Sequence, residues 1–372
     1  MASIQLDKIG KSFGAVDTIR EIDLAIDDGE FVCLLGPSGC GKTTTLRMIA
    51  GLEQPSRGSI RIGGRDVTCA QPKDRNIGMV FQDYALYPHM TIADNIAYPL
   101  KVRGVAEATR HEKAREIAEV LHIGQLLDRL PAQISGGQQQ RTSLARALVH
   151  PAAAFLFDEP LSNLDARMRV EARAFLHHLQ RSRGMTAVYV THDQAEAMAL
   201  STRIAVMCAG DIVQYAPPLE IYRRPATTFV AGFVGDPPMN LVAAQAKRNG
   251  HDVALRGAGL QMAPIVSWPA LDLALERSDR VTVGVRPEHL RITAGDVAAN
   301  RLHGKLFANE AMGPESLVTL DLNGGVRVTA RIFGDASLRI ESDAAFAFDA
   351  DRFTLFDAQG VRIPGAAEDP SN

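Results

Sequence analysis

The chain has few cysteines, little net charge and no long hydrophobic run. Its four cysteines, Cys33, Cys40, Cys69 and Cys208, form no C-x-x-C pair, which argues against a disulfide framework or zinc site and predicts a reduced, cytoplasmic compartment. With a formal net charge of −3, the chain has no overall positive charge that would attract nucleic acid. Because no uncharged apolar run reaches about twenty residues, we expect no membrane-spanning helix. The first residues do not resemble a signal peptide.

The length points to two domains. A chain of 372 residues exceeds what one hydrophobic core normally supports. Buried-strand and helical patterns alternate at first, whereas short alternating strands such as 281–285 and 326–332 dominate later and suggest a small β-barrel. The turn-rich string at 236–239 therefore predicts a boundary between domains at 1–236 and 237–372.

The most informative stretch is a glycine-rich turn between a predicted strand and a predicted helix. Residues 31–35 form an apolar run typical of a strand buried on both faces, and 43–50 have a helical pattern followed by Gly51. The turn matches G-x-x-x-x-G-K-[ST] and consists of Gly36, Pro37, Ser38, Gly39, Cys40, Gly41, Lys42 and Thr43. Its N–H groups would bind phosphate oxygens, with Lys42 on the β- and γ-phosphates and Thr43 on Mg²⁺. The sequence therefore predicts nucleoside triphosphate binding.

Polar residues follow three more apolar runs, and we expect them at the same edge of the sheet. They are Gln82 at the end of the run 76–82, Asp158 and Glu159 after 152–157, and His192 after 187–190. Two adjacent acids at a strand end are costly unless a cation or proton chemistry uses them. Asp158 is therefore predicted to ligate Mg²⁺ and Glu159 to act as a general base. His192 is predicted to contact the γ-phosphate.

Three further features each allow two interpretations. The Phe13 ring either stacks on an adenine base or fills a satellite core. The apolar loop 84–90 is either a partner surface or packs on the helical region 93–130 that follows. A predicted helix begins with Ser135, Gly136, Gly137 and Gln138. This start is either an ordinary helix cap or a second anion-binding site.

In this order and spacing, the motifs resemble those of the ATP-binding cassette (ABC) ATPases. The Walker A loop is matched by 36–43, the Q-loop by Gln82, the signature by 134–138, Walker B by 155–159, the D-loop by 162–165 and the switch histidine by His192. The S-G-G-Q signature distinguishes this family from other proteins with a Walker A loop. Three departures, Phe13, Ile134 in place of leucine and Phe157, keep apolar or aromatic character.

Longer strings resemble the ATPase subunits of bacterial carbohydrate importers, the maltose and glycerol-3-phosphate group, over essentially the whole chain. These strings are 80–91, 158–165 and 235–240, and 283–288 is similar to the family's regulatory domain. The resemblance implies an α/β P-loop ABC ATPase domain with a RecA-like core, an antiparallel β subdomain and an α-helical subdomain at about 88–150. It implies an all-β, TOBE-like OB-fold domain after it.

The resemblance also implies how the site is assembled. Two copies would face each other, with ATP between the Walker A loop of one and signature residues 135–138 of the other. Phe13, Thr44 and Asp165 would also contact the nucleotide. Glu159 would polarise the attacking water, while Gln82 and His192 position water, Mg²⁺ and γ-phosphate. The resemblance assigns Mg²⁺ to Thr43, Gln82 and Asp158.

Partners follow from the same resemblance. We expect a homodimer at the cytoplasmic face of the inner membrane, bound through residues 84–90 to a permease that works with a separate solute-binding protein. The string 235–240 favours sugar, oligosaccharide or glycerol-3-phosphate, with polyamine, iron or sulfate as alternatives. A soluble ABC ATPase acting on nucleic acid is disfavoured, because such families carry two cassettes or a long coiled coil. A regulatory role for the C-terminal barrel stays open.

Overall fold

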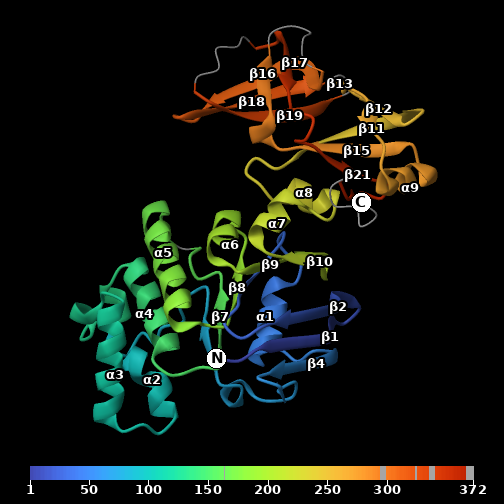
Figure 1. Cartoon of the computed structure of the whole chain (residues 1–372). Coiled ribbons are helices and arrows are strands. Elements are labelled where there is room, and N and C mark those ends of the chain that lie inside the picture. Colours follow the sequence, from blue (N-terminus) through green and yellow to red (C-terminus); the bar gives the residue numbers. More distant parts are fainter. Residues whose placement is uncertain (163, 294–298, 323–324, 335–339, 366–372) are drawn as a thin grey trace. The chain divides into compact units, whose positions relative to one another are not determined.

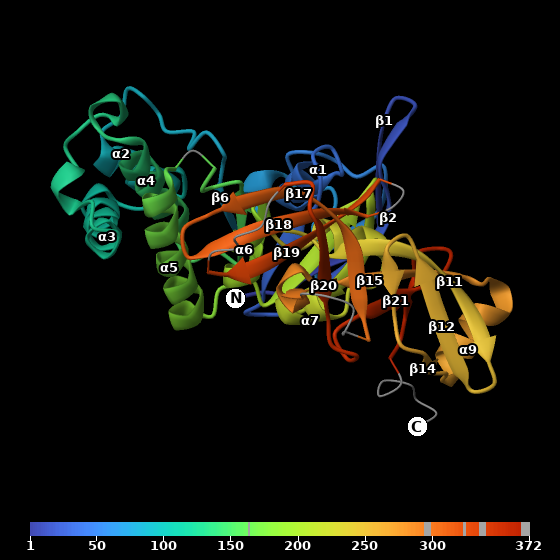
Figure 2. The ribbon, with the colours of Figure 1, turned by 90° about the horizontal axis from the view of Figure 1, so that it is seen from above.

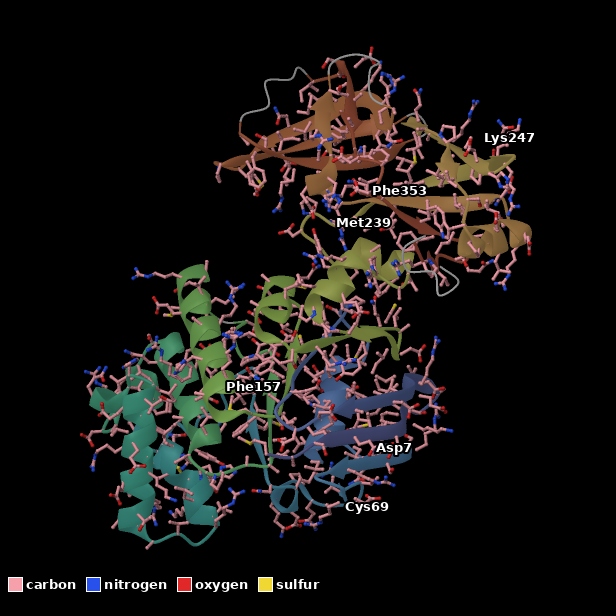
Figure 3. The ribbon with its side chains drawn as sticks, in the orientation of Figure 1. Asp7, Cys69, Phe157, Met239, Lys247 and Phe353 are labelled. Carbon is pink, nitrogen blue, oxygen red and sulfur yellow. The ribbon has the colours of Figure 1, made fainter. Side chains whose placement is uncertain are left out.

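Continuous apolar runs form the central sheet of the first of two units, Met1–Leu219 (Figure 1). Its strands are β3 (Phe31–Leu35), β6 (Ile77–Val80), β7 (Ala154–Asp158), β8 (Ala187–Thr191), β9 (Arg203–Cys208) and β10 (Asp211–Ala216). The sheet order is β10-β9-β3-β8-β7-β6, and β3 pairs in parallel with β8 and β9. Every residue of β3, β7 and β8 is buried, as predicted for strands covered on both faces. Phe157, labelled in Figure 3, belongs to this buried set.

The computed structural model describes residues 1–162, 164–293, 299–322, 325–334 and 340–365. Asn163 of the predicted D-loop lies outside the described residues. Packing divides the chain between Leu219 and Glu220, so α8 (Thr228–Phe233) and most of α7 (Pro218–Arg223) belong to the second unit. The predicted domain boundary at 236–239 stays a prediction.

The helix after the phosphate loop begins and ends where the sequence predicts. Helix α1 (Lys42–Ala50) follows β3 directly, and Gly51 ends it with a left-handed φ of 77°. The Gly51 N–H donates to the carbonyls of Arg47 and Met48, which satisfies groups that a helix end leaves unpaired.

A second, antiparallel sheet packs against α1. It has the order β2-β1-β4-β5 and consists of β1 (Ile4–Phe13), β2 (Val16–Ile26), β4 (Arg57–Ile62) and β5 (Arg65–Asp66). Ile4 pairs with Ile26 and Leu6 with Leu24, and all four side chains are buried. Their alternation confirms the prediction of half-buried strands. One core unites this sheet with Leu46 and other α1 residues.

The region predicted to be helical at 93–130 contains the helices α2 and α3. The helices of the first unit are α2 (Ile92–Val102), α3 (Glu107–Val120), α4 (Gly136–Leu148), α5 (Ala166–Arg183) and α6 (Gln194–Leu200), besides α1. Thr91 starts α2 by accepting a hydrogen bond from the Asp94 N–H, which is a typical N-cap. Figures 1 and 2 show α2, α3 and α4 side by side.

The second unit, Glu220–Asn372, is mainly antiparallel β structure, as predicted. Its strands are β11 (Asn240–Asn249), β12 (Asp252–Gly257), β13 (Leu260–Gln261), β14 (Ile265–Val266), β15 (Arg280–Val285), β16 (Arg291–Thr293), β17 (Arg301–Ala311), β18 (Glu315–Leu322), β19 (Val326–Phe333), β20 (Asp343–Ala347), β21 (Thr354–Phe356) and β22 (Arg362–Ile363), with helix α9 (Pro269–Arg277). Alternate residues of β18, such as Val318 and Leu320, are buried in one core. Within the described parts of the chain, no helix combines the length and apolar character needed to cross a membrane.

His150, just after α4, is an unpaired buried histidine. Its side chain is 6% exposed, and neither ring nitrogen has a hydrogen-bond partner among the described residues. Burial, followed by the charge of Arg103, lowers the pKa of His150 to about 4. In the unfolded chain, His150 takes up a proton near its ordinary pKa of 6.5. In the folded chain it stays neutral over this range, so the free energy of unfolding decreases as the pH falls from 6.5 toward 4.

We expect His150→Leu to reduce this acid sensitivity. The loss of unfolding free energy between pH 7 and pH 4 should be about 3 kcal/mol smaller than in the wild type, measured by urea unfolding at several pH values. His178→Leu, at an exposed histidine of α5, is the matched control and should leave the pH dependence unchanged. Equal pH dependence in the His150 variant and the wild type would contradict the prediction.

Candidate active site

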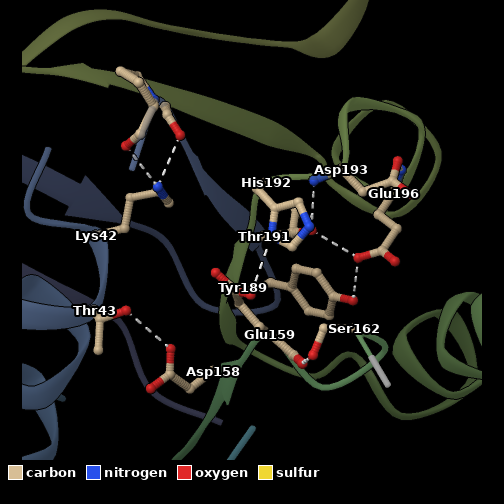
Figure 4. A network of polar contacts seen from close by, with 12 residues as sticks. Lys42, Thr43, Asp158, Glu159, Ser162, Tyr189, Thr191, His192, Asp193 and Glu196 are labelled. Atoms are coloured by element: carbon tan, nitrogen blue, oxygen red, sulfur yellow. Dashed lines mark hydrogen bonds and ion pairs between the residues drawn. The ribbon is translucent and has the colours of Figure 1, made fainter. Parts of the chain in front are cut away.

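Lys42 is held inside the phosphate loop by backbone carbonyls. Its Nζ donates to the oxygens of Gly36 at 2.8 Å and Pro37 at 3.0 Å (Figure 4), and the residue is 7% exposed. Among the described residues, no carboxylate pairs with this ammonium. A buried cation without an anion is unfavourable, so the loop is built to receive an anionic group. Gly41 supports the turn with φ 103°, and a Cβ there would meet Ile19 Cδ1 at 2.2 Å.

Asp158 and Thr43 form a pair of oxygen donors at the carboxyl end of β7. The Thr43 hydroxyl donates to Asp158 Oδ1 at 3.2 Å (Figure 4), although the two residues are far apart in the sequence. Burial raises the pKa of Asp158, and the Thr43 hydrogen bond and Arg47 charge oppose that shift. A buried carboxylate beside a hydroxyl is an oxygen-rich arrangement that fits Mg²⁺.

Glu159 and His192 meet at the same edge of the sheet. His192 Nδ1 lies 3.1 Å from Glu159 Oε2, with the histidine side chain 63% and the glutamate side chain 20% exposed. Glu159 has a left-handed φ of 45°, a conformation that costs a non-glycine residue energy and tends to persist at functional sites. The Glu159 carbonyl is held by Ser162, whose hydroxyl donates to it at 2.9 Å. The arrangement leaves a partly exposed carboxylate at the carboxyl end of β7, beside an exposed imidazole.

A second layer of polar contacts supports His192, and sequence reasoning missed most of it. Glu196 Oε2 accepts hydrogen bonds from Tyr189 and Thr191, each at 2.8 Å (Figure 4). Thr191 Oγ1 in turn accepts from the Asp193 N–H at 2.9 Å. Burial raises the pKa of Glu196, and the two hydroxyl donors oppose the shift. These bonds flank His192 on both sides and restrict its position.

Arg169 links this layer to the D-loop. Its guanidinium lies 3.3 Å from Asp193 Oδ2 and donates to the Leu164 carbonyl at 3.0 Å. Asp193 also caps α6 by accepting from the N–H groups of Ala195 and Glu196. The acid before a helical pattern signalled the role of Asp193, whereas no pattern signalled Arg169.

Other predicted site residues lie at the ends of helices and strands of the first unit. Ser135 is the N-cap of α4 and forms a reciprocal capping box with Gln138, while Asp165 is the N-cap of α5. No hydrogen bond or ion pair joins these described residues to the phosphate loop. Phe13 is 48% exposed at the end of β1, with Lys11 over its ring, so it does not fill a core. Gln82 is exposed two residues after β6.

The loop at 84–90 is partly packed and partly exposed. Tyr84 is 6% exposed, and Arg146 donates to its carbonyl at 2.7 Å. Asn95, fully buried on α2, donates to the carbonyls of Tyr87 and Met90 at 3.1 Å. The packing interpretation therefore holds for Tyr84, whereas Pro88 and His89 are exposed. The hydrogen bonds from Arg146 and Asn95 therefore hold the backbone of the loop, while its tip at Pro88 and His89 is exposed to solvent.

A phosphate loop, an acid–hydroxyl pair for a cation and a carboxylate beside a histidine define a nucleoside triphosphatase of the P-loop class. Family models agree: "ABC transporter" matches residues 19–162, "MalK OB fold domain" matches 235–290 and "TOBE domain" matches 283–356. The sn-glycerol-3-phosphate import ATP-binding protein of Cereibacter sphaeroides is 47% identical over 97% of this chain and 99% of its own length. The trehalose/maltose import ATP-binding protein of Thermococcus litoralis is 46% identical over 96% of this chain and 98% of its own length.

A solved structure gives the same result for the first unit. The dimeric, post-hydrolysis ATP-binding cassette MJ0796 bound to ADP and Pi is 30% identical, with a TM-score of 0.53 over 58% of this chain and 98% of that one. The chain belongs to the ABC transporter family, among its import ATP-binding proteins. It is an ATPase with an ABC cassette followed by OB-fold and TOBE domains.

Proposed function

We propose that the chain energises the import of a carbohydrate or glycerol phosphate by hydrolysing ATP between two copies bound to a permease. The observation that carries this proposal is the buried Lys42 ammonium, whose partners among the described residues are carbonyl oxygens and a sulfur, in the same unit as the Glu159–His192 pair. Relatives along nearly the whole chain are named for importing sn-glycerol-3-phosphate, sulfoquinovosyl glycerol and trehalose or maltose, which supports this solute class.

The residues divide the reaction between binding and proton transfer. Lys42 and the loop N–H groups bind the β- and γ-phosphates, and Phe13 stacks on the base. Glu159 accepts a proton from the attacking water, while His192, held by its Nδ1 contact to Glu159, directs Nε2 at the γ-phosphate. Mg²⁺ would be held by Thr43, Asp158 and Gln82 and would neutralise charge on the phosphates.

The signature residues act on the nucleotide of a second copy. Ser135 to Gln138 open α4 with exposed Ser135 and Gly136, so the helix N-terminus is open to an anion from outside the chain. Asp165 contributes from the start of α5. A cassette relative with bound ADP and Pi is dimeric, which supports a homodimer. Closing and opening of this dimer would carry the energy of ATP binding to the permease.

A hollow in the first unit suits the permease contact. It has a volume of about 740 Å³ and is lined largely by apolar residues, including Leu52, Tyr87, Tyr98 and Val102. Leu52 and Val102 are 49% and 65% exposed, and the ordered loop at 84–90 forms one side. We assign this hollow to a short amphipathic helix of the permease, because such helices bury apolar residues in grooves of this kind. The chain would thereby be peripheral to the cytoplasmic face of the membrane.

We expect Val102→Asp to weaken coupling to the permease without changing basal ATP hydrolysis. A charge forced into an apolar contact costs enough to lower permease-stimulated ATPase activity about tenfold, measured with the permease in detergent or nanodiscs. Val170→Asp, at a valine of α5 that is 56% exposed and lies outside the hollow, is the matched control. Full stimulation of the Val102 variant would contradict the docking assignment.

A further inference from the structure

One face of the second unit carries a row of alternating arginine and glutamine side chains. Direct register partners across five neighbouring strands, β17, β13, β12, β11 and β15, are Arg301, Gln261, Arg256, Gln245 and Arg280. Directly opposed residues project from the same face of an antiparallel sheet, and the opposite face contributes Val253, Leu255 and Val283 to the core. The row contains no carboxylate, although the chain as a whole is acidic.

Two of these arginines have no anionic partner. The side chains of Arg256 and Arg280 are exposed, and among the described residues no hydrogen bond or ion pair is made by either guanidinium. Two other exposed arginines of this unit do pair: Arg248 lies 2.6 Å from Asp272, and Arg291 lies 2.5 Å from Asp349. The guanidinium groups of Arg256 and Arg280 are therefore both available to an anion.

Both arginines line a pocket of about 700 Å³. Gln245 and Thr282 contribute to its floor, and Thr228 of α8 and the turn at 357–360 line its side. Asp357 also lines the pocket, but its Oδ1 accepts hydrogen bonds from two N–H groups of its own turn at 2.9 Å. Neither arginine forms an ion pair with this carboxylate among the described residues, so both guanidinium groups can bind an outside ligand.

The geometry points to a ligand with a phosphate group. Adjacent strands lie about 4.8 Å apart, so the Cα atoms of Arg256 and Arg280 are about 10 Å apart with Gln245 between them. Two long side chains at that spacing can converge on one tetrahedral anion above Gln245, whose amide adds a donor. Guanidinium groups match phosphate in charge and shape. We propose that this pocket binds inorganic phosphate or a small phosphate monoester.

Two other anionic ligands fit less well. None of the described residues that line the pocket is aromatic, whereas single-stranded nucleic acid is bound largely by stacking on aromatic rings. An acidic protein segment would spread over the whole row, but Arg301 already donates to Gln261 Oε1 at 2.9 Å. The free charge is confined to the concave end of the row, where a small molecule fits.

Isothermal titration calorimetry with the full-length chain tests the proposal by measuring the affinity of each probe. Saturating Mg-ADP fills the phosphate loop, and the probes are inorganic phosphate, glycerol 3-phosphate as a phosphate monoester, and uncharged glycerol. We expect both phosphates to bind and glycerol not to bind. Arg256→Gln and Arg280→Gln should each weaken binding about tenfold, since each removes a charge-assisted contact, and the double variant should not bind.

Arg277→Gln is the matched control. It removes the same charge from an exposed arginine of α9, outside the pocket, and should bind as the wild type does. If inorganic phosphate and glycerol 3-phosphate bind with equal affinity, the pocket recognises the phosphate group alone. If glycerol 3-phosphate binds more tightly, the pocket is specific for a phosphate monoester. Absence of binding, unchanged binding in the double variant, or binding of a polyglutamate peptide alone would overturn the proposal. The measurement needs no permease, so its failure would leave the proposed transport role intact.

Discussion

Glu159→Gln should abolish steady-state ATP hydrolysis while leaving ATP-dependent dimerisation in place. The substitution removes the carboxylate that we propose as the base but keeps the size of the side chain and its hydrogen bond to His192, which lies 3.1 Å away. General-base catalysis contributes about 10²- to 10⁴-fold, so we expect activity to fall about a thousandfold. Phosphate release by the purified chain measures the rate, and size-exclusion chromatography with Mg-ATP measures the dimer.

Glu112→Gln provides the control, because Glu112 is exposed on α3 and should retain wild-type activity. If Glu159→Gln hydrolyses ATP at the wild-type rate, Glu159 is not the base and the assignment of the site is wrong. An inactive variant that also fails to dimerise with ATP would contradict the claim that Glu159 acts on water rather than on assembly. Residues other than Glu159 would then have to position the water and neutralise the charge that develops during hydrolysis.

Arg75→Met should destabilise the first unit strongly. Arg75 is 2% exposed, and its guanidinium donates to the carbonyls of Met48, Ile49, Ala70 and Thr68 at 2.8 to 3.0 Å. Burial lowers the pKa of Arg75, yet two carbonyls at the end of α1, those of Met48 and Ile49, and two carbonyls of the segment after β5 accept its protons. Methionine fills similar space without donors, and we expect a loss of about 3 kcal/mol because buried acceptors lose charged partners.

Far-UV circular dichroism and fluorescence can follow the two units separately. The single tryptophan, Trp268, lies in the second unit, so its emission is an internal reference. The Arg75 variant should lower the transition temperature of the first unit by about 6–12 °C and leave the Trp268 transition in place. Arg65→Met, at an exposed arginine of β5, should shift neither. An unshifted first transition in the Arg75 variant would show that these hydrogen bonds contribute little.

The features closest to the chemistry were predictable because they depend on short-range spacing. A strand, a glycine-rich turn and a helix in immediate succession specify the phosphate loop, whatever the rest of the chain does. Asp158 and Glu159 come directly after a buried run, and parallel strands bring such ends to one edge. The structure accordingly places Thr43 beside Asp158 and His192 beside Glu159.

The supporting residues were not predictable, since each depends on neighbours distant in the sequence. No motif in the sequence marks Arg75, and its role comes from the fold, which brings its guanidinium to a carbonyl at the end of α1. Arg169 and Glu196 sit in unremarked helical stretches, and their roles come from contacts with Asp193 and with Tyr189. Tyr84 belonged to a loop with two interpretations. The burial of its side chain decided between them, and Ser143 of α4 donates to its backbone carbonyl.

By itself, then, the sequence determined the family, the ATPase chemistry and the residues at the strand ends, because local motifs carry that information. Only the tertiary structure decided which side chains hold those residues in place and which charges are left without partners. The pairing of Gln245 with both Arg256 and Arg280 depends on strand register, and a slip of one residue would move each side chain to the opposite face. Register and burial are set by the packing of whole sheets, which no short stretch of sequence specifies.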